Sequence, residues 1–154
     1  MTADKTSFVY VTYIASTPEK VFEAITRPDV ARLYWGHENV SDWAPGSSWR
    51  HVRDDDERPV EIVGKVVESA PPHRLVMTWT GASQASDPDS YSRVTFQIEP
   101  NDHGVRLSVS HDDLQAGSGM AAGVSKGWPL VLSSLKSYLE TGRGFDLSGR
   151  ARAA

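Results

Sequence analysis

Ser125 is the residue whose sequence surroundings most resemble a catalytic motif. It lies in Gly123-Val124-Ser125-Lys126-Gly127, which matches the G-x-S-x-G pattern of a nucleophilic serine. That chemistry needs a sharp strand-to-helix turn at the serine, followed along the chain by an acid and then a histidine. The last histidine of this chain is His111, upstream of Ser125. We therefore expect the match to be accidental and Ser125 not to be a nucleophile.

The other polar residues do not form a metal or nucleotide site by spacing. Cysteine is absent, and the five histidines, at positions 37, 51, 73, 103 and 111, share no metal-ligand spacing. The acidic run Asp54-Asp55-Asp56-Glu57 is more typical of a solvated hairpin tip than of a metal site. The glycines at 117, 119 and 123 are spaced one residue too widely for the dinucleotide-binding fingerprint. The sequence therefore predicts no cofactor and no metal.

Aromatic and polar side chains occur instead on strand faces that would ordinarily be plain core. Trp49 and His51 share one face of a predicted strand, and His111 falls on the inward face of another. Further large residues occupy inward positions on neighbouring strands and on a C-terminal helix: Met77, Trp79, Phe96, Trp128, Leu132 and Leu135. Two interpretations are open. These residues form a bulky core with histidines near strand ends, or they line a cavity whose few polar groups orient a ligand.

The elements that position these residues follow from periodicity and from breakers. Residues 6–15 are rich in Val, Tyr, Phe, Thr and Ile and predict a strand. A helix is expected from Pro18, capped by Thr17, and a second short helix after Pro28. The apolar side of this second helix is expected to carry Val30, Leu33 and Tyr34. Alternation then predicts an antiparallel meander of strands at residues 48–53, 60–69, 74–80, 92–99 and 105–111, with a polar loop at 81–90.

A long amphipathic helix is predicted near the C-terminus. Apolar residues from Met120 to Leu139 recur every three or four positions, and Gly142 follows them. Pro129 lies inside this pattern and removes one backbone hydrogen bond, so we expect a kink or a restart near Gly127-Trp128. The segment 143–154 lacks periodicity and is expected to be a flexible tail. Residues 1–142 are thus expected to form one α+β domain of two layers.

Length and composition exclude several classes of protein. The chain has 154 residues, 16 Lys and Arg against 20 Asp and Glu, and a net charge of −4. This mild acidity, without a basic cluster, argues against a nucleic-acid partner. No apolar run is long enough to span a membrane, and the N-terminus lacks the pattern of a signal peptide. We expect a cytoplasmic protein.

Several segments resemble a known family. Residues 14–26 (IASTPEKVFEAIT) are similar to the opening of the SRPBCC (START-like) superfamily, in the branch named for the activator of heat-shock protein 90 ATPase. Residues 64–76 (GKVVESAPPHRLV), 108–111 (SVSH) and the helix from Gly127-Trp128-Pro129 to Gly142 fit the same branch. The resemblance extends over residues 8 to 142, in the expected order. It implies a helix-grip fold, in which a curved antiparallel sheet of about six to seven strands wraps a long C-terminal helix, with two short helices after the first strand.

This fold carries binding proteins, cyclases and co-chaperones alike, so the resemblance leaves three functional hypotheses. The first is a domain that binds a small hydrophobic ligand, through Trp49, His51, Met77, Trp79, Phe96, His111, Trp128, Leu132 and Leu135. The second is a cyclase-like or hydrolytic enzyme that uses the same cavity, with a histidine as general base. The third is a module with a chaperone partner. The eukaryotic activators add a separate N-terminal domain that contacts the chaperone, and this chain has no room for one, so we expect no stimulation of a chaperone ATPase.

Overall fold

The computed structural model describes residues 4–147. In chain order the elements are β1 (Lys5–Ile14), α1 (Pro18–Thr26), α2 (Pro28–Trp35), β2 (His37–Ser41), β3 (Ser48–Arg53), β4 (Val60–Ala70), β5 (Arg74–Gly81), the short 3₁₀ turns η1 (Ala82–Gln84) and η2 (Pro88–Ser90), β6 (Ser92–Asn101), β7 (Gly104–Gln115) and α3 (Gly119–Thr141). The expected α+β order of strand, two short helices, meander and long helix is confirmed.

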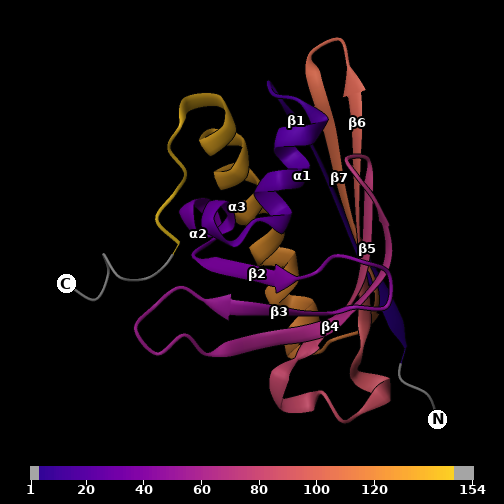
Figure 1. Ribbon diagram of the computed structural model, residues 1–154. Coiled ribbons are helices and arrows are strands. Elements are labelled where there is room, and N and C mark those ends of the chain that lie inside the picture. The colour runs from indigo at the N-terminus through magenta and orange to yellow at the C-terminus, as the bar shows by residue number, and fades with distance from the viewer. Residues whose placement is uncertain (1–3, 148–154) are drawn as a thin grey trace.

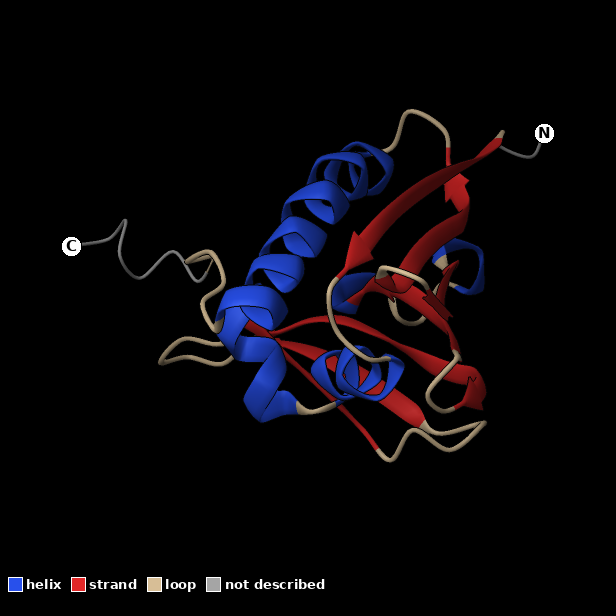
Figure 2. Ribbon diagram, turned by 90° about the horizontal axis from the view of Figure 1, so that it is seen from above, coloured by secondary structure: helices blue, strands red, loops and turns tan. Residues whose placement is uncertain are grey.

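The strands form one antiparallel sheet in the order β1-β7-β6-β5-β4-β3-β2. Sequential strands are neighbours from β2 to β7, because short turns join them, and β1 pairs with β7 at the far edge. In Figure 1, β2, β3 and β4 cross in front at a steep angle to β6 and β7, so the sheet is strongly curved. Seen from above, α3 lies along the hollow side of that curve (Figure 2). This is the helix-grip architecture expected from the sequence.

Strand β2 is the element that the hydrophobic pattern does not reveal. Its sequence is HENVS, and two of its polar residues are buried. The carboxylate of Glu38 accepts two hydrogen bonds from the Arg58 guanidinium, at 3.0 and 2.9 Å. The side-chain amide of Asn39 donates to the Ile25 carbonyl at 2.8 Å. These partners satisfy polar groups that would otherwise be costly to bury, so the strand forms without apolar alternation.

The helix boundaries follow the expected signals. The hydroxyl of Thr17 caps α1 by accepting from Lys20 N, and Pro28 begins α2. Helix α3 ends at Gly142, which has φ of 85° and donates its N–H to Tyr138 O at 2.8 Å. Of the expected kink or restart near Gly127-Trp128, the restart does not occur, since α3 continues through Pro129. Proline removes only one hydrogen bond, and tertiary packing outweighs that loss here.

One detail of the core differs from the sequence interpretation. Helix α2 buries Ala31, Tyr34 and Trp35, whereas Leu33, expected on its apolar side, is exposed. The hydroxyl of Tyr34 donates to Ala24 O at 2.8 Å, which fixes the helix in this rotation. In β4, a Cβ on Gly64 would lie 1.9 Å from Thr78 O, so only glycine lets the chains approach this closely.

The beginning of the expected tail packs on the helices. Phe145 N donates to the Ser134 hydroxyl at 2.8 Å, and this hydroxyl donates to Tyr34 O at 2.7 Å. Leu147 packs against the core. Residues 143–147 therefore cover the contact between α2 and α3, while residues 148–154 of the expected tail lie outside the described residues.

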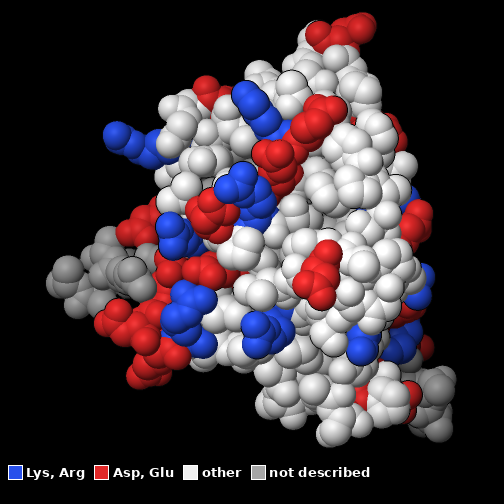
Figure 3. Space-filling view, viewed as in Figure 1, with Lys and Arg blue, Asp and Glu red and all other residues white. Residues whose placement is uncertain are grey.

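The surface carries both signs of charge (Figure 3). Acidic side chains gather around the turn between β3 and β4 (Figure 3), where Arg53 pairs with Asp55 and Arg58 pairs with Glu38. Asp55 there accepts from the backbone N–H groups of Glu57 and Arg58. This is the expected hairpin tip, and residues 4–147 contain no group of side chains that could hold a metal ion. Within the same range, no helix is long and apolar enough to cross a membrane.

Candidate functional site

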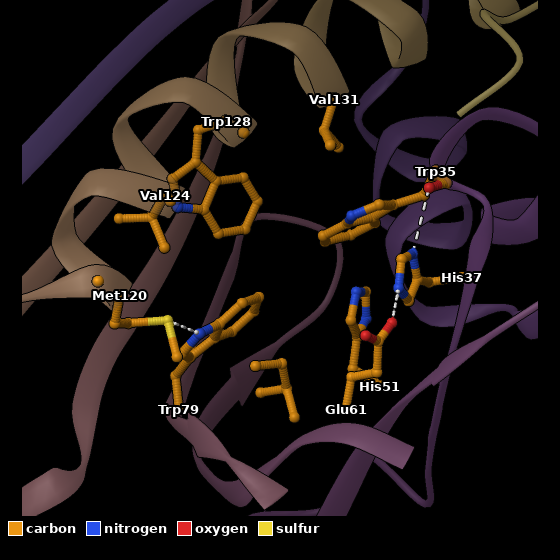
Figure 4. Close-up of a pocket in the computed structure, with 13 residues that line it drawn as sticks. Trp35, His37, His51, Glu61, Trp79, Met120, Val124, Trp128 and Val131 are labelled. Carbon is orange, nitrogen blue, oxygen red and sulfur yellow. Dashed lines mark hydrogen bonds and ion pairs between the residues drawn. The ribbon is translucent and has the colours of Figure 1, made fainter. Parts of the chain in front are cut away.

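A pocket of about 510 Å³ lies between the N-terminal half of α3 and the sheet. Its lining comes from α2, from β2 to β5 and from α3: Trp35, His37, His51, Glu61, Ile62, Trp79, Gly119, Met120, Gly123, Val124, Gly127, Trp128 and Val131. Figure 4 shows its labelled aromatic side chains converging from α2, from the sheet and from α3. A volume of this size is in the usual range for small-molecule sites.

Three tryptophans form the apolar wall. The ring centroid of Trp128 lies 5.6 Å from that of Trp35 and 5.5 Å from that of Trp79. Trp79 donates its indole N–H to the sulfur of Met120 at 3.4 Å, a weak partner (Figure 4). The three indoles come from α2, β5 and α3, so the fold assembles the wall from segments far apart in the chain.

The helix side of the pocket is lined by glycine. Gly119, Gly123 and Gly127 are four residues apart, and this spacing places them on one face of α3. A Cβ added at any of these glycines would meet no atom within 4 Å. The pocket therefore owes part of its volume to side chains that this face of the helix lacks.

His51 is the buried polar group at the base of the pocket, 4% exposed. Asn39 donates its amide to Ile25 O, so its Oδ1 accepts, and the partner at 2.7 Å is Nδ1 of His51. Nδ1 therefore carries the proton and Nε2 is an acceptor. Burial, and secondarily the charge of His37, hold the pKa of His51 well below its usual value, so the ring is neutral at pH 7.

The acceptor nitrogen of His51 faces the pocket. No protein partner of Nε2 exists among residues 4–147, whereas every fully buried side-chain nitrogen and oxygen in that range has one. Nε2 must therefore reach open space, and the space that His51 borders is the pocket. The indole N–H of Trp35, which borders the same pocket, is likewise without a partner in the described chain.

The polar rim is made by His37 and Glu61. The His37 ring stacks on His51 with centroids 4.1 Å apart and planes within 5° of parallel. Its Nε2 lies 2.6 Å from Glu61 Oε1, and its Nδ1 lies 3.3 Å from Trp35 O (Figure 4). The other oxygen of Glu61 is 3.7 Å from the guanidinium of Arg53. The carboxylate at the rim thus already has two basic neighbours.

His111, in contrast, is fully buried and has all its partners. Its Nδ1 accepts the indole N–H of Trp128 at 3.0 Å. Nε2 consequently carries the proton and donates to the Ser92 hydroxyl at 2.7 Å, which in turn donates to Trp79 O at 3.1 Å. Burial lowers the pKa of His111 to about 4. The histidine acts as a spacer that holds Trp128 in the pocket wall, and it does not line the pocket itself.

Of the nine predicted site residues, the structure brings His51, Trp79 and Trp128 together around the pocket. The other six are buried away from its lining: Trp49, Met77, Phe96, His111, Leu132 and Leu135. Their inward orientation is as expected, but neighbouring side chains fill the space in front of them. Sequence reasoning missed Trp35, His37, Glu61 and the glycines of α3. The spacing of the glycines was the available signal.

Ser125 lies in the middle of α3 with its side chain exposed. Its hydroxyl donates to Ala121 O in the preceding turn. The serine therefore has neither the strand-to-helix turn nor the histidine that a nucleophile needs. The two glycines of its motif are explained by the pocket.

The pocket and fold can now be set beside known proteins. A family model described as "Activator of Hsp90 ATPase homolog 1-like protein" matches residues 15–140. The chain belongs to this family. The resemblance expected from the sequence is confirmed. No curated protein gives a significant match.

Solved structures of this family's fold are similar along nearly the whole chain. Protein MLL2253 from Mesorhizobium loti is 27% identical, with a TM-score of 0.72 over 87% of this chain and 96% of that one. The Aha1 dimer from Colwellia psychrerythraea is 22% identical, with a TM-score of 0.75 over 90% and 99% of the two chains. Protein SSP2350 from Staphylococcus saprophyticus is 19% identical, with a TM-score of 0.70 over 92% and 96%.

Proposed function

We propose that this member of the family binds a small, mainly apolar aromatic molecule in the pocket under α3. The observation that supports this most strongly is the space itself. Three tryptophans and several aliphatic side chains border about 510 Å³ into which the helix projects only glycines along one row. Pockets that are largely apolar with a few polar groups are the usual form of small-molecule sites.

Binding accounts for the polar groups better than catalysis does. A general base works best with a pKa near the working pH, whereas burial holds the pKa of His51 well below its usual value. A ring that burial keeps neutral has one nitrogen free to accept a hydrogen bond, but it is a weak base. Ser125 is exposed and mid-helix, so it supplies no nucleophile to the pocket.

The test is thermal unfolding with indole and 2-naphthol as probes. A ligand at 100 times its dissociation constant stabilises a fold by about 2.7 kcal/mol. For a domain of about 150 residues this raises the midpoint by roughly 5–10 °C. Gly123→Leu should fill the pocket and abolish the rise, while Ser125→Leu, at a position of the same helix that does not line the pocket, should keep it. If neither probe shifts the wild type, or if Gly123→Leu shifts equally, the proposal fails.

A chaperone-interacting module is the second candidate, and the family description is the observation that favours it. Such a module would act through its surface and would be indifferent to the pocket. We expect no stimulation of the ATPase of Hsp90 by this protein. A saturable, several-fold increase in ATP turnover that persists in Gly123→Leu would favour this second candidate over ligand binding.

A further inference from the structure

We infer that the ligand of this pocket is a neutral aromatic molecule that carries an O–H or N–H group, which it donates to Nε2 of His51. This inference rests on the proposed function and adds the polarity of the ligand to it. It follows from a chain of hydrogen bonds from His51 through Asn39 to the Ile25 carbonyl, which fixes which atom donates and which accepts at each step.

The direction begins at a backbone carbonyl. Ile25 O can only accept, so the nitrogen of the Asn39 amide faces it, at 2.8 Å. The amide oxygen is thereby turned to Nδ1 of His51, at 2.7 Å, and must accept the proton there. Both side chains are buried, with Asn39 fully so, and the bonds leave no room for the opposite tautomer. Nε2 is a fixed acceptor.

The position of this acceptor selects its partner. The His51 ring is directed from β3 into the space bordered by Trp35, Trp79 and Trp128 (Figure 4). Its ring centroid is 4.8 Å from that of Trp35 and 5.8 Å from that of Trp79. A donor group that reaches Nε2 is therefore attached to a part of the ligand that lies among indole rings. A hydroxyl or N–H on an aromatic ring fits this combination.

The charged neighbours disfavour an ionic ligand. An anion would meet the lone pair of Nε2 and the carboxylate of Glu61, which also borders the pocket. A cation would need that carboxylate, but His37 lies 2.6 Å from it and Arg53 lies 3.7 Å from it. The lone pair of Nε2 and the two pairings of Glu61 leave an uncharged donor as the group that fits beside His51 without displacing a partner.

Three naphthalenes of similar size separate these alternatives: 2-naphthol, which donates, 2-methoxynaphthalene, which only accepts, and 2-naphthoate, which is an anion. Calorimetric titration at pH 7 should show 2-naphthol binding about tenfold or more tightly than either analogue, because a bound molecule without a donor leaves Nε2 desolvated and unpaired. Equal affinity for 2-naphthol and 2-methoxynaphthalene, or tighter binding of 2-naphthoate, overturns the inference and leaves the proposed function standing. If none of the three binds, the proposed function itself fails.

Two histidine variants provide the matched comparison. His51→Phe removes the acceptor, so the affinity ratio of 2-naphthol to 2-methoxynaphthalene should fall to about 1. His103→Gln changes an exposed histidine in the turn between β6 and β7, which does not line the pocket, and should keep the wild-type ratio. A ratio that survives in His51→Phe contradicts the inference. If His51→Phe does not fold, the wild-type ligand series decides alone.

Discussion

The two halves of helix α3 face the same sheet with opposite results. The N-terminal half presents Gly119, Gly123 and Gly127, and a pocket lies against it. The C-terminal half presents Leu132 and Leu135, which are completely buried in solid core. The backbone is continuous through both halves. Val124 and Trp128 pack inward on the N-terminal half as Leu132 does on the C-terminal half. The comparison teaches that the pocket depends on the neighbouring row of glycines, which has no side chains to fill the space beside Val124 and Trp128.

The largest expected effect is that of a substitution in the C-terminal half of α3, where leucines fill the core. Leu135→Ala removes a completely buried side chain, and we expect the free energy of unfolding to fall by about 2–5 kcal/mol. Urea unfolding monitored by circular dichroism measures this. A loss below about 1 kcal/mol would show that the space around Leu135 is not packed, and the contrast between the halves would then disappear.

The boundary between the halves is Trp128, and the burial of its hydrogen-bond partner His111 should make stability depend on pH. The folded pKa of His111 is about 4, below the unfolded value of 6.5, so between these values the unfolded state binds more protons. Stability is complete above pH 6.5 and falls as the pH decreases, by about 3 kcal/mol from this group at pH 4. His51 shifts in the same direction and adds to the slope.

The control for this pH dependence is His111→Gln. Glutamine does not titrate, and its amide can accept from Trp128 and donate to Ser92 as the histidine does. Unfolding free energies measured from pH 7 to pH 4 should decrease less steeply in the variant than in the wild type. Parallel curves would contradict the account of His111 as a buried neutral acceptor.

A smaller effect on stability, of opposite sign, is expected in the N-terminal half of α3, beside the pocket. Gly123→Ala adds a methyl group that meets no atom within 4 Å and replaces the second-worst helix former with the best. We expect stability to increase by about 1 kcal/mol, as measured by the same urea titration. Destabilisation would mean that the space beside Gly123 is closed in solution.

The smallest effect is expected on the exposed side of the helix. Ser125→Ala should change stability by less than about 1 kcal/mol and leave ligand binding unaltered, because the hydroxyl bonds only within the helix. A fluorophosphonate probe should not label the wild-type protein. Covalent modification of Ser125, detected by mass spectrometry, would contradict both the structural argument and the assignment of the G-x-S-x-G glycines to the pocket.

The fold was largely predictable from sequence, because alternation and helical spacing record which face of each element is buried. Strand β2 escaped this reasoning because Glu38 and Asn39 are buried by pairing with Arg58, Ile25 and His51, contacts that only the tertiary structure creates. The same limit applies to the site. Periodicity predicts that Trp79 and Leu135 both point inward, but it does not predict which of the two borders the pocket.

The glycines of α3 and the residues beside Gly36 carry the most information about the site. Gly119 and Gly123 do not fit the dinucleotide fingerprint, and Gly123 and Gly127 flank Ser125 in the G-x-S-x-G match. The spacing of four that Gly119, Gly123 and Gly127 share marks a helix face without side chains. Trp35 and His37 lie on either side of Gly36, where α2 ends and β2 begins, and no pattern links them to Trp79 or Trp128. Only the curvature of the sheet brings such residues together around one pocket.

The central claim is that a ligand binds in the pocket beside the N-terminal half of α3. The five tryptophans of the chain test this claim most directly. Trp35, Trp79 and Trp128 line the pocket, whereas Trp43 and Trp49 do not. In ¹H–¹⁵N spectra recorded during titration with 2-naphthol, the indole resonances of the first three should shift together and saturate. Those of Trp43 and Trp49, whose N–H groups are bonded to Thr26 O and Thr78 O, should remain in place. Shifts confined to Trp43 or Trp49, or no shifts at all, would contradict the account.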